Sequence, residues 1–274
     1  MLLRLFTAVY PVVQTVYLSF LKVDLLSQIN RFVGLQNFWK LAVEPAIGTI
    51  LYFTLVFIAA STVLELILGM GIANLLNTWF RGRKIARTVN LIPWAIPTIV
   101  AALGFRWLLD SEYGLVIDWI YRIFGWRPEL LISPTLAQLS VILVNVWKNT
   151  PFMAVVLLAG LQSIPAEFYE AAKIDGATSF QRLRYITIPL STPLVITLGL
   201  FFVIWQLASF DLIYGMTQGG PGVATTLIAY RIFQRGMLWF DWGTASALSV
   251  LLILIVAAVG VLGLYLFRRY EVTI

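Results

Sequence analysis

Long apolar stretches are the feature of this sequence that most limits how it can fold. A helix that spans a bilayer needs about 20 mostly apolar residues, because each residue advances the helix by about 1.5 Å through a hydrocarbon core roughly 30 Å thick. Only 12% of the residues are charged, about half the share found in soluble domains. We therefore predict a single all-α integral membrane domain over residues 1–274. Six helices are expected to span the membrane, at about residues 1–21, 46–76, 88–109, 135–161, 191–214 and 244–267.

The first and third stretches each allow two interpretations. The first has the length of a secretion signal, but it contains Pro11 and several aromatic residues and lacks a small-x-small cleavage site, which favours a retained helix. Pro93 and Pro97 interrupt the third stretch, so a kink is expected there. The backbone carbonyls freed by that kink either face a translocation path or merely accompany a bend that shapes the helix bundle.

Positive charge predicts the orientation in the membrane. The short turn after the second stretch, "RGRKIAR" (residues 81–87), carries four basic residues and no acid. Short loops rich in Lys and Arg remain on the cytoplasmic side. Counting along the chain from this turn places both termini and the polar segment 163–190 in the cytoplasm.

The residues that are missing exclude several kinds of chemistry. The chain has no Cys and no His, so thiolate metal sites and Ser/His or Cys/His nucleophile pairs are excluded. It has no Gly-Lys pair and hence no P-loop, so we do not expect it to hydrolyse ATP itself. Glu65 and Asp211 are isolated acids at membrane depth, which argues against a membrane-embedded hydrolase. An ion-coupled secondary transporter is the remaining alternative, but the chain lacks its usual repeated halves and paired carboxylates.

The sequence of the polar segment 163–190 predicts a helix, a tight turn and a second helix. Pro165 is tolerated in a first helical turn, and Asp175-Gly176 is a stop signal, because Gly accepts the left-handed cap conformation. Thr178 and Gln181 have capping-box spacing and start a second helix, which Ile188-Pro189 is expected to end. The segment is either a solvated amphipathic loop or a surface that docks a partner.

This segment resembles the EAA signature of binding-protein-dependent ABC importer permeases. Glu-Ala-Ala at 170–172, Gly176 and Ile-x-x-Pro at 186–189 match its spacing. The resemblance implies the six-helix type I ABC importer permease fold, with a cytoplasmic coupling helix between helices 4 and 5 that docks on an ATPase subunit. The coupling residues that it implies are Glu167, Glu170, Ala171, Ala172, Asp175, Gly176 and Ala177.

Residues 144–172 and 212–230 resemble carbohydrate-uptake permeases of the maltose/trehalose type. The Thr-x-Gly-Gly-Pro element at 217–221 is similar to the first of that family's two permease subunits. The resemblance implies a prokaryotic cytoplasmic membrane and a heterodimer with a second homologous permease. It also implies two further kinds of partner, an extracytoplasmic sugar-binding protein and two ATPase subunits. The ATPase subunits, and not this chain, are expected to bind ATP and Mg.

Two polar clusters lie within the apolar stretches. Asn145, Lys148, Asn149 and Phe152 fall on one helical face, and a mixed aromatic and polar stretch in the fifth segment holds Gln206, Ser209 and Asp211. Polar residues inside membranes tend to face cavities or other helices. A sugar needs amide and carboxylate partners for its hydroxyls and an aromatic surface for its ring, so these seven residues are the candidate substrate contacts.

Each cluster also has a structural alternative. Asn145 and Gln206 would also fit as hydrogen-bond donors between helices, and Lys148 as the ion-pair partner of Asp211 or Glu65. The resemblance implies that positions matching Asn145, Asn149, Phe152, Gln206 and Ser209 lie at or near the sugar. Lys148 differs from the residue expected at its position in a maltose permease. The substrate is expected to be a di- or oligosaccharide such as maltose or trehalose, with glycerol-3-phosphate or another polyol as the alternative.

Overall fold

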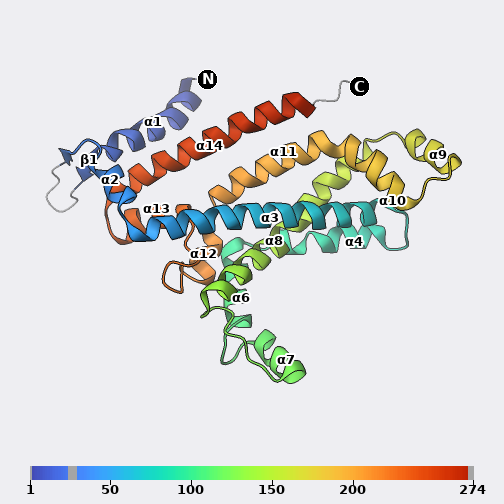
Figure 1. Cartoon of the computed structure of the whole chain (residues 1–274), viewed down its shortest axis with the longest axis horizontal. Helices are drawn as coiled ribbons and strands as arrows, with labels where there is room; N and C mark the ends of the chain where they lie inside the picture. Colours follow the sequence, from blue (N-terminus) through green and yellow to red (C-terminus); the bar gives the residue numbers. More distant parts are fainter. Residues whose placement is uncertain (1, 24–29, 271–274) are drawn as a thin grey trace. The chain divides into compact units, whose positions relative to one another are not determined.

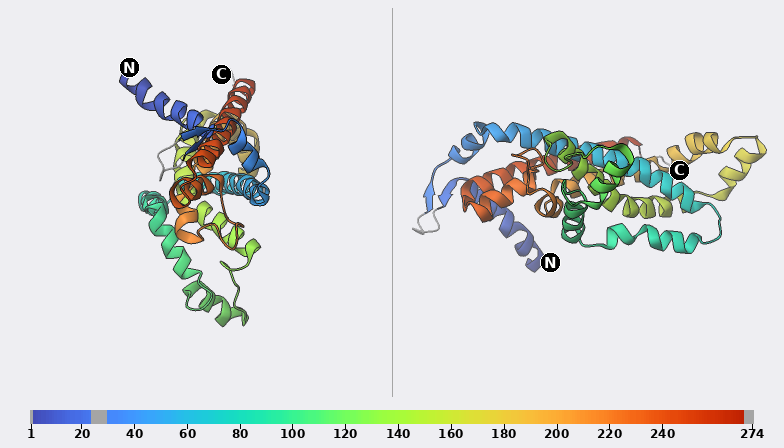
Figure 2. Two further views of the ribbon diagram at one scale, coloured as in Figure 1. Left: turned by 90° about the vertical axis from the view of Figure 1, so that its left-hand side faces the viewer. Right: turned by 90° about the horizontal axis from the view of Figure 1, so that it is seen from below.

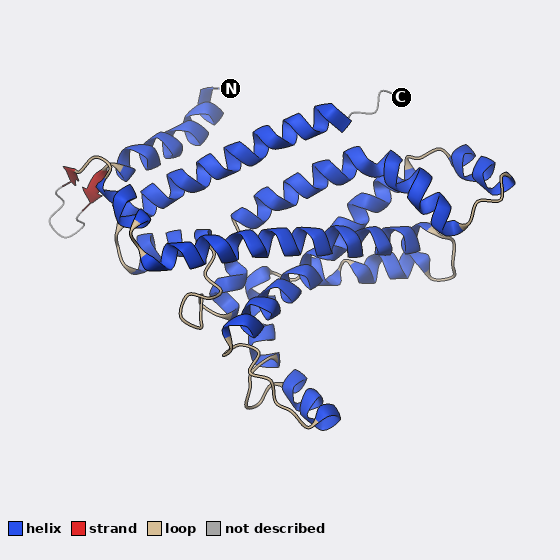
Figure 3. Cartoon of the chain, viewed as in Figure 1, coloured by secondary structure: helices blue, strands red, loops and turns tan. Residues whose placement is uncertain are grey.

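Most of the described residues are helical, and two short strands among them form one pair (Figures 1 and 3). The structure is a computed structural model that describes residues 2–23 and 30–270, so Met1 lies outside the described residues. The elements are α1 (Leu2–Ser19), β1 (Leu21–Val23), β2 (Asn30–Phe32), α2 (Gln36–Ala42), α3 (Pro45–Asn77), α4 (Arg83–Asn90), α5 (Ile92–Ala95), α6 (Thr98–Leu108), α7 (Leu115–Phe124), α8 (Pro134–Gln162), α9 (Ala166–Ile174), α10 (Ser179–Arg182), the π-helix η1 (Leu183–Thr187), α11 (Ile188–Leu207), α12 (Asp211–Met216), α13 (Ile228–Phe233), the π-helix η2 (Gln234–Leu238) and α14 (Trp242–Tyr270).

Among the described residues, four helical segments are long and apolar enough to cross a membrane: Pro45–Asn77, Pro134–Gln162, Ser179–Leu207 and Trp242–Tyr265. A fifth candidate is the pair Arg83–Ala95 and Thr98–Leu108, bent by 86°. The stretches 46–76, 135–161 and 244–267 are helical, and α3, α8 and α14 extend one to three residues beyond the predicted bounds. The first stretch is helical as α1, but its 18 residues reach only about 27 Å, and it is not among these candidates.

Two predicted helices differ from the structure. The stretch 88–109 is not one kinked helix but α4, α5 and α6, because Ile96 is extended before Pro97 and the chain turns sharply there. The stretch 191–214 is not one helix either. α11 ends at Leu207, and Asp211 starts α12, where an acid in the first turn favours a helix N-terminus.

Pro189 does not end the second helix of the polar segment, contrary to the prediction. The helical run continues from Ser179 through Leu207, and residues 183–187 form the π-helix η1, which ends two residues before the proline. A proline removes an N–H donor and its ring crowds the carbonyl four residues earlier. The wider π-turn gives the backbone an alternative hydrogen-bonding pattern at that point, so the helix passes through.

The chain divides into two compact units, made of residues 1–57, 98–141 and 206–258, and of residues 58–97, 142–205 and 259–274. In the first unit β1 and β2 pair antiparallel, with Leu21 opposite Phe32, and α6 packs against α12. Gly215 makes that packing close, because a Cβ on it would lie 2.7 Å from the Cβ of Ala102. A buried cluster joins α2, α13 and α14 through Leu41, Ile228, Ala247 and Leu248.

The second unit is built on the C-terminal parts of α3 and α8 together with α11. Its buried core consists of Ala73, Leu76, Met153, Leu157, Leu158, Leu161, Leu198 and Phe202. Within this unit the α9–α10 hairpin projects beyond the C-terminal end of α3, as Figure 1 and the right-hand view of Figure 2 both show. The hairpin is therefore a surface feature, whereas the polar face of α8 lies inside the unit.

Candidate functional site

The polar face of α8 is buried in the second unit, as its helical spacing predicts. Asn149 Nδ2 donates to Asn145 Oδ1 at 3.0 Å, and Asn145 Nδ2 donates to Glu65 Oε1 on α3 at 3.1 Å. This chain of hydrogen bonds links α8 to α3. Asn145 therefore makes the interhelical bond considered as its structural alternative.

Lys148 binds the backbone at the break before Pro97. Its Nζ donates to the carbonyl oxygens of Ile96 at 2.7 Å and Trp94 at 3.2 Å. These carbonyls lie where the chain leaves α5, so no following helical turn satisfies them. The break predicted at the prolines thus exposes carbonyls that Lys148 binds, so its ammonium is used here and not in an ion pair with Asp211 or Glu65.

An aromatic pocket lies beside this polar face, within the same unit. Its volume is about 110 Å3 and its lining is Trp94, Asn149, Phe152, Phe201, Phe202 and Trp205. Trp94 stacks on Phe152 with ring centroids 4.9 Å apart and planes 17° apart, and Phe201 lies 5.8 Å from Trp205. One amide among flat aromatic faces suits the apolar face of a sugar ring and one of its hydroxyls.

The sequence predicts only part of this pocket. Asn149 and Phe152 are among the predicted contacts, whereas Trp94, Phe201 and Phe202 are not. Trp94 lies between two prolines in an otherwise apolar stretch, and that position was the available signal. The pocket is smaller than the roughly 300–1,000 Å3 of a complete ligand site, so it has the size of one wall or subsite.

The other three predicted contacts belong to the first unit. Gln206, in the last turn of α11, is buried, and Ser209 lies in the break after it, where its N–H donates to Gln206 O at 3.0 Å. Asp211 is exposed at the start of α12. The three residues therefore lie on either side of a helix break and do not share one helical face.

The α9–α10 hairpin carries the predicted coupling residues. Gly176 has φ +78°, its N–H donates to Lys173 O at 3.1 Å, and the N–H of Ala177 donates to Ala172 O at 2.8 Å. This pair of bonds is the Schellman motif, in which a left-handed glycine ends a helix, so the predicted stop is confirmed. The exposed coupling residues are Glu167, Glu170, Ala171, Asp175 and Gly176, and the half-buried ones are Ala172 and Ala177.

The second helix of the hairpin begins with the predicted capping box. The backbone N–H of Thr178 donates to Gln181 Oε1 at 2.7 Å, and the N–H of Gln181 donates to Thr178 Oγ1 at 3.2 Å. Large apolar side chains are exposed on the hairpin, with Ile174 87% and Phe180 70% accessible. Ordered caps together with exposed apolar side chains are typical of a surface that another protein covers.

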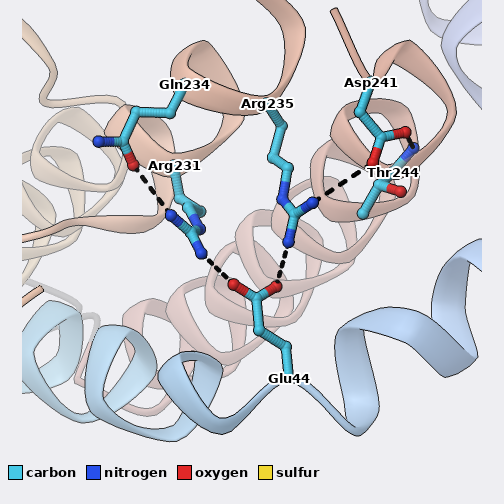
Figure 4. Close-up of polar contacts among 6 residues, drawn as sticks. All are labelled: Glu44, Arg231, Gln234, Arg235, Asp241 and Thr244. Atoms are coloured by element: carbon cyan, nitrogen blue, oxygen red, sulfur yellow. Dashed lines mark hydrogen bonds and ion pairs between the residues drawn. The ribbon is translucent and has the colours of Figure 1, made fainter. Parts of the chain in front are cut away.

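An ion cluster in the first unit was not predicted from the sequence (Figure 4). Glu44, directly before α3, accepts hydrogen bonds from Arg231 of α13 and from Arg235 of η2, the latter at 2.7 Å. Arg235 also donates to Asp241 at 3.3 Å, and both arginines lie over the ring of Trp239. Burial alone would raise the pKa of Glu44, but the hydrogen bonds and charges of the two arginines outweigh it and hold that pKa below its ordinary value.

Comparison with known proteins gives consistent matches. A family model described as "Binding-protein-dependent transport system inner membrane component" matches residues 65–272. The chain is 38% identical to the trehalose/maltose transport system permease protein MalF of Thermococcus litoralis, over 95% of this chain and 89% of that protein. It is 37% identical to the sulfoquinovosyl glycerol transport system permease protein SmoG of Agrobacterium fabrum, over 89% of this chain and 80% of that protein. A solved bacterial ABC transporter that imports the polysaccharide alginate contains a chain with TM-score 0.83 and 22% identity, over 100% of this chain and 93% of that one.

Proposed function

Because the chain belongs to the family of binding-protein-dependent transport system inner membrane components, we propose that it forms part of the translocation path of an ATP-driven sugar importer. Its fold is the all-α type I ABC importer permease fold. The proposed location is a prokaryotic inner membrane, with both termini and the α9–α10 hairpin in the cytoplasm. The basic, acid-free turn between α3 and α4 supports that orientation.

The proposed partners follow from what the chain lacks. Without a P-loop it has no ATP-binding site of its own, so two ATPase subunits supply hydrolysis. A second homologous permease completes the path, and an extracytoplasmic binding protein delivers the sugar. The α9–α10 hairpin is the proposed dock for an ATPase subunit, with Glu170, Ala172 and Gly176 at its centre.

The aromatic pocket is the observation that carries the sugar assignment. Trp94, Phe152 and Trp205 offer ring faces beside the amide of Asn149, the combination that binds a sugar ring and its hydroxyls. The relatives named for trehalose/maltose and for sulfoquinovosyl glycerol support a glycoside substrate. A di- or oligosaccharide such as maltose or trehalose is therefore our first candidate.

Glycerol-3-phosphate and other polyols are the second candidate, and the geometry favours them less. A phosphate in the aromatic pocket would need a cation, but no Lys or Arg among the described residues lines that pocket, and the ammonium of the neighbouring Lys148 is already bonded to two carbonyls. A polyol also lacks the flat apolar ring face that the aromatic pocket would cover. An ion-coupled secondary transporter is weaker still, since the family match is to binding-protein-dependent systems.

Substrate-stimulated ATP hydrolysis tests this proposal. The complete transporter would be reconstituted with its binding protein and offered a panel of trehalose, maltose, longer glucosides, glycerol-3-phosphate and free polyols. We expect hydrolysis to rise with a di- or oligosaccharide only. Stimulation by glycerol-3-phosphate but by no sugar would overturn the substrate assignment.

A further inference from the structure

A second cavity lies between the α9–α10 hairpin and the end of α3, and its chemistry differs from that of the aromatic pocket. Its volume is about 520 Å3, and all of its lining residues belong to the second unit. Leu183 is its one apolar lining residue. The polar lining is Asn74, Asn77, Thr78, Tyr169, Lys173, Ser179, Arg182 and Thr187.

The lining has two positive charges and no negative one. Tyr169 and Lys173 are four residues apart on α9, so both side chains are on the same face of that helix. Arg182 donates from Nη2 to Ser179 Oγ at 3.0 Å, which orients its guanidinium, and the hydroxyls of Tyr169 and Thr187 are 3.1 Å apart. Among the described residues, neither cation forms an ion pair with an acid.

This combination of groups favours a phosphate anion. Two cations in a concave surface concentrate positive potential, and a guanidinium matches the oxygens of a phosphate in a forked geometry. The surrounding hydroxyls add neutral donors. Glu167, Glu170 and Asp175 lie on the same hairpin but do not line the cavity.

The cavity also lies at the right depth for a lipid headgroup. α3 has 33 residues and is about 50 Å long, whereas a bilayer measures roughly 30 Å across its hydrocarbon and 40–45 Å with its headgroups. The last residues of α3, which line the cavity, therefore lie at or beyond the headgroup level. On the orientation in the proposed function, that level is the cytoplasmic leaflet, where anionic lipids attract basic segments.

We propose that this cavity binds the phosphate group of an anionic ligand, supplied by a phospholipid headgroup or by a soluble phosphate compound. The bound anion bridges Lys173 and Arg182 of the hairpin to the end of α3. The anion thereby holds the α9–α10 hairpin against α3. The concentration of anionic lipid or soluble phosphate then determines how much of the time the hairpin and α3 are held together. This inference rests on the proposed function only for the side of the membrane on which the cavity opens.

Lipid retention tests the proposal directly. The complete transporter would be placed in nanodiscs of phosphatidylcholine with phosphatidylglycerol, and the lipids that stay bound would be counted by native mass spectrometry. We expect the wild type to retain phosphatidylglycerol in preference to phosphatidylcholine. The double variant Lys173→Gln/Arg182→Gln should retain about tenfold less phosphatidylglycerol than the wild type, because it removes two charged contacts. In a second arm, binding of inorganic phosphate would be measured in nanodiscs of phosphatidylcholine alone.

The matched control is the double variant Arg81→Gln/Arg184→Gln. It removes the same two charges from exposed residues of the same unit that do not line the cavity. If this control still retains phosphatidylglycerol, the result supports a specific binding site in the cavity. Equal losses in both double variants would show that surface charge in general attracts the lipid, and would overturn the proposal. Phosphate binding that is lost only in Lys173→Gln/Arg182→Gln supports the site with a soluble source.

A wild type that neither prefers phosphatidylglycerol nor binds inorganic phosphate contradicts the proposal without any variant. Size-exclusion elution and ATPase subunit assembly would check that the variants fold. Because the readout is binding and not transport, a failed sugar panel leaves this result standing. A failed binding result likewise leaves the proposed transport function intact.

Discussion

Asn145, Lys148 and Asn149 share one face of α8, yet each side chain has a different neighbour. Asn145 bonds to Glu65 on α3, Lys148 bonds to the carbonyls before Pro97, and Asn149 borders the aromatic pocket. Helical spacing predicts the common face, but the neighbouring elements decide what each residue does there. Of the three, Asn149 is the one that we propose as a substrate contact.

Replacing Asn149 by Ala should weaken sugar uptake without preventing assembly. Loss of one hydrogen bond to a sugar hydroxyl should raise the apparent KM about three- to tenfold. Uptake by the reconstituted transporter measures this. The matched control is Thr150→Val, the next residue along, which has a buried hydroxyl and should transport as the wild type does. Unchanged uptake in Asn149→Ala would show that the Asn149 amide does not contact the substrate and only forms its hydrogen bond to Asn145.

The cluster around Glu44 should make stability depend on pH. The arginines hold the pKa of Glu44 below its ordinary 4.5, so the ionised carboxylate stabilises the fold fully above that pH and progressively less as the pH falls through the lowered folded pKa. Glu44→Gln should cost about 2 kcal/mol of unfolding free energy at pH 7, because it leaves Arg231 and Arg235 without their shared acid.

Unfolding in detergent from pH 7 to pH 3.5 measures that effect. The gap between the wild type and Glu44→Gln should narrow below about pH 4.5. Glu129→Gln removes an exposed acid and serves as the control, for which little change is expected. A gap that stays constant over the whole range would show that Glu44 contributes through packing and not through charge.

At the scale of elements, the hairpin is the part whose structure is best predicted by local signals. Gly176, Thr178 and Gln181 make the bonds that their types and spacing indicate, because caps involve only neighbours along the chain. The exit from the hairpin was harder to predict. A proline such as Pro189 predicts the end of a helix, and the π-turn that lets this helix continue has no local signature in the sequence.

Gly176→Val should separate ATP hydrolysis from transport. A β-branched residue at φ +78° strains the turn by roughly 1–2 kcal/mol and tilts α9 relative to α10. We expect sugar uptake to fall while basal ATP hydrolysis persists. Gly82→Val is the matched control, since Gly82 has φ +89° in a different turn, and at both glycines an added Cβ would have no neighbouring atom within 4 Å. Equal effects of the two variants would argue that backbone strain, not docking, explains the loss.

Lys148→Met should destabilise the bend between α5 and α6. It leaves the carbonyls of Trp94 and Ile96 without their charged donor, at a cost of about 1.5–3 kcal/mol. Thermal unfolding in detergent measures the loss, and Lys148→Arg should restore part of it because it returns a charged donor. A wild-type unfolding temperature in Lys148→Met would show that water satisfies these carbonyls instead.

At the scale of the whole molecule, hydropathy predicts the membrane class and most of the long helices, because lipid imposes the same requirement on every residue of a span. It fails at the end of α11, where apolar residues continue past Leu207 although the helix does not. It also fails at the Glu44 cluster, where Arg231 and Arg235 follow Glu44 by 187 and 191 residues. It fails again at Trp94, whose place in the pocket depends on the break between α5 and α6. Contacts between distant segments leave no periodic pattern in the sequence.

The source of energy for uptake is the most direct test of the central claim that this chain is one subunit of an ATP-driven sugar importer. Uptake of labelled sugar would be measured in proteoliposomes that hold either this chain alone or the complete transporter with its binding protein. We predict accumulation only in the complete transporter supplied with ATP, and none by the chain alone under a proton or sodium gradient. Accumulation by the chain alone under an ion gradient, without ATP, would contradict the account.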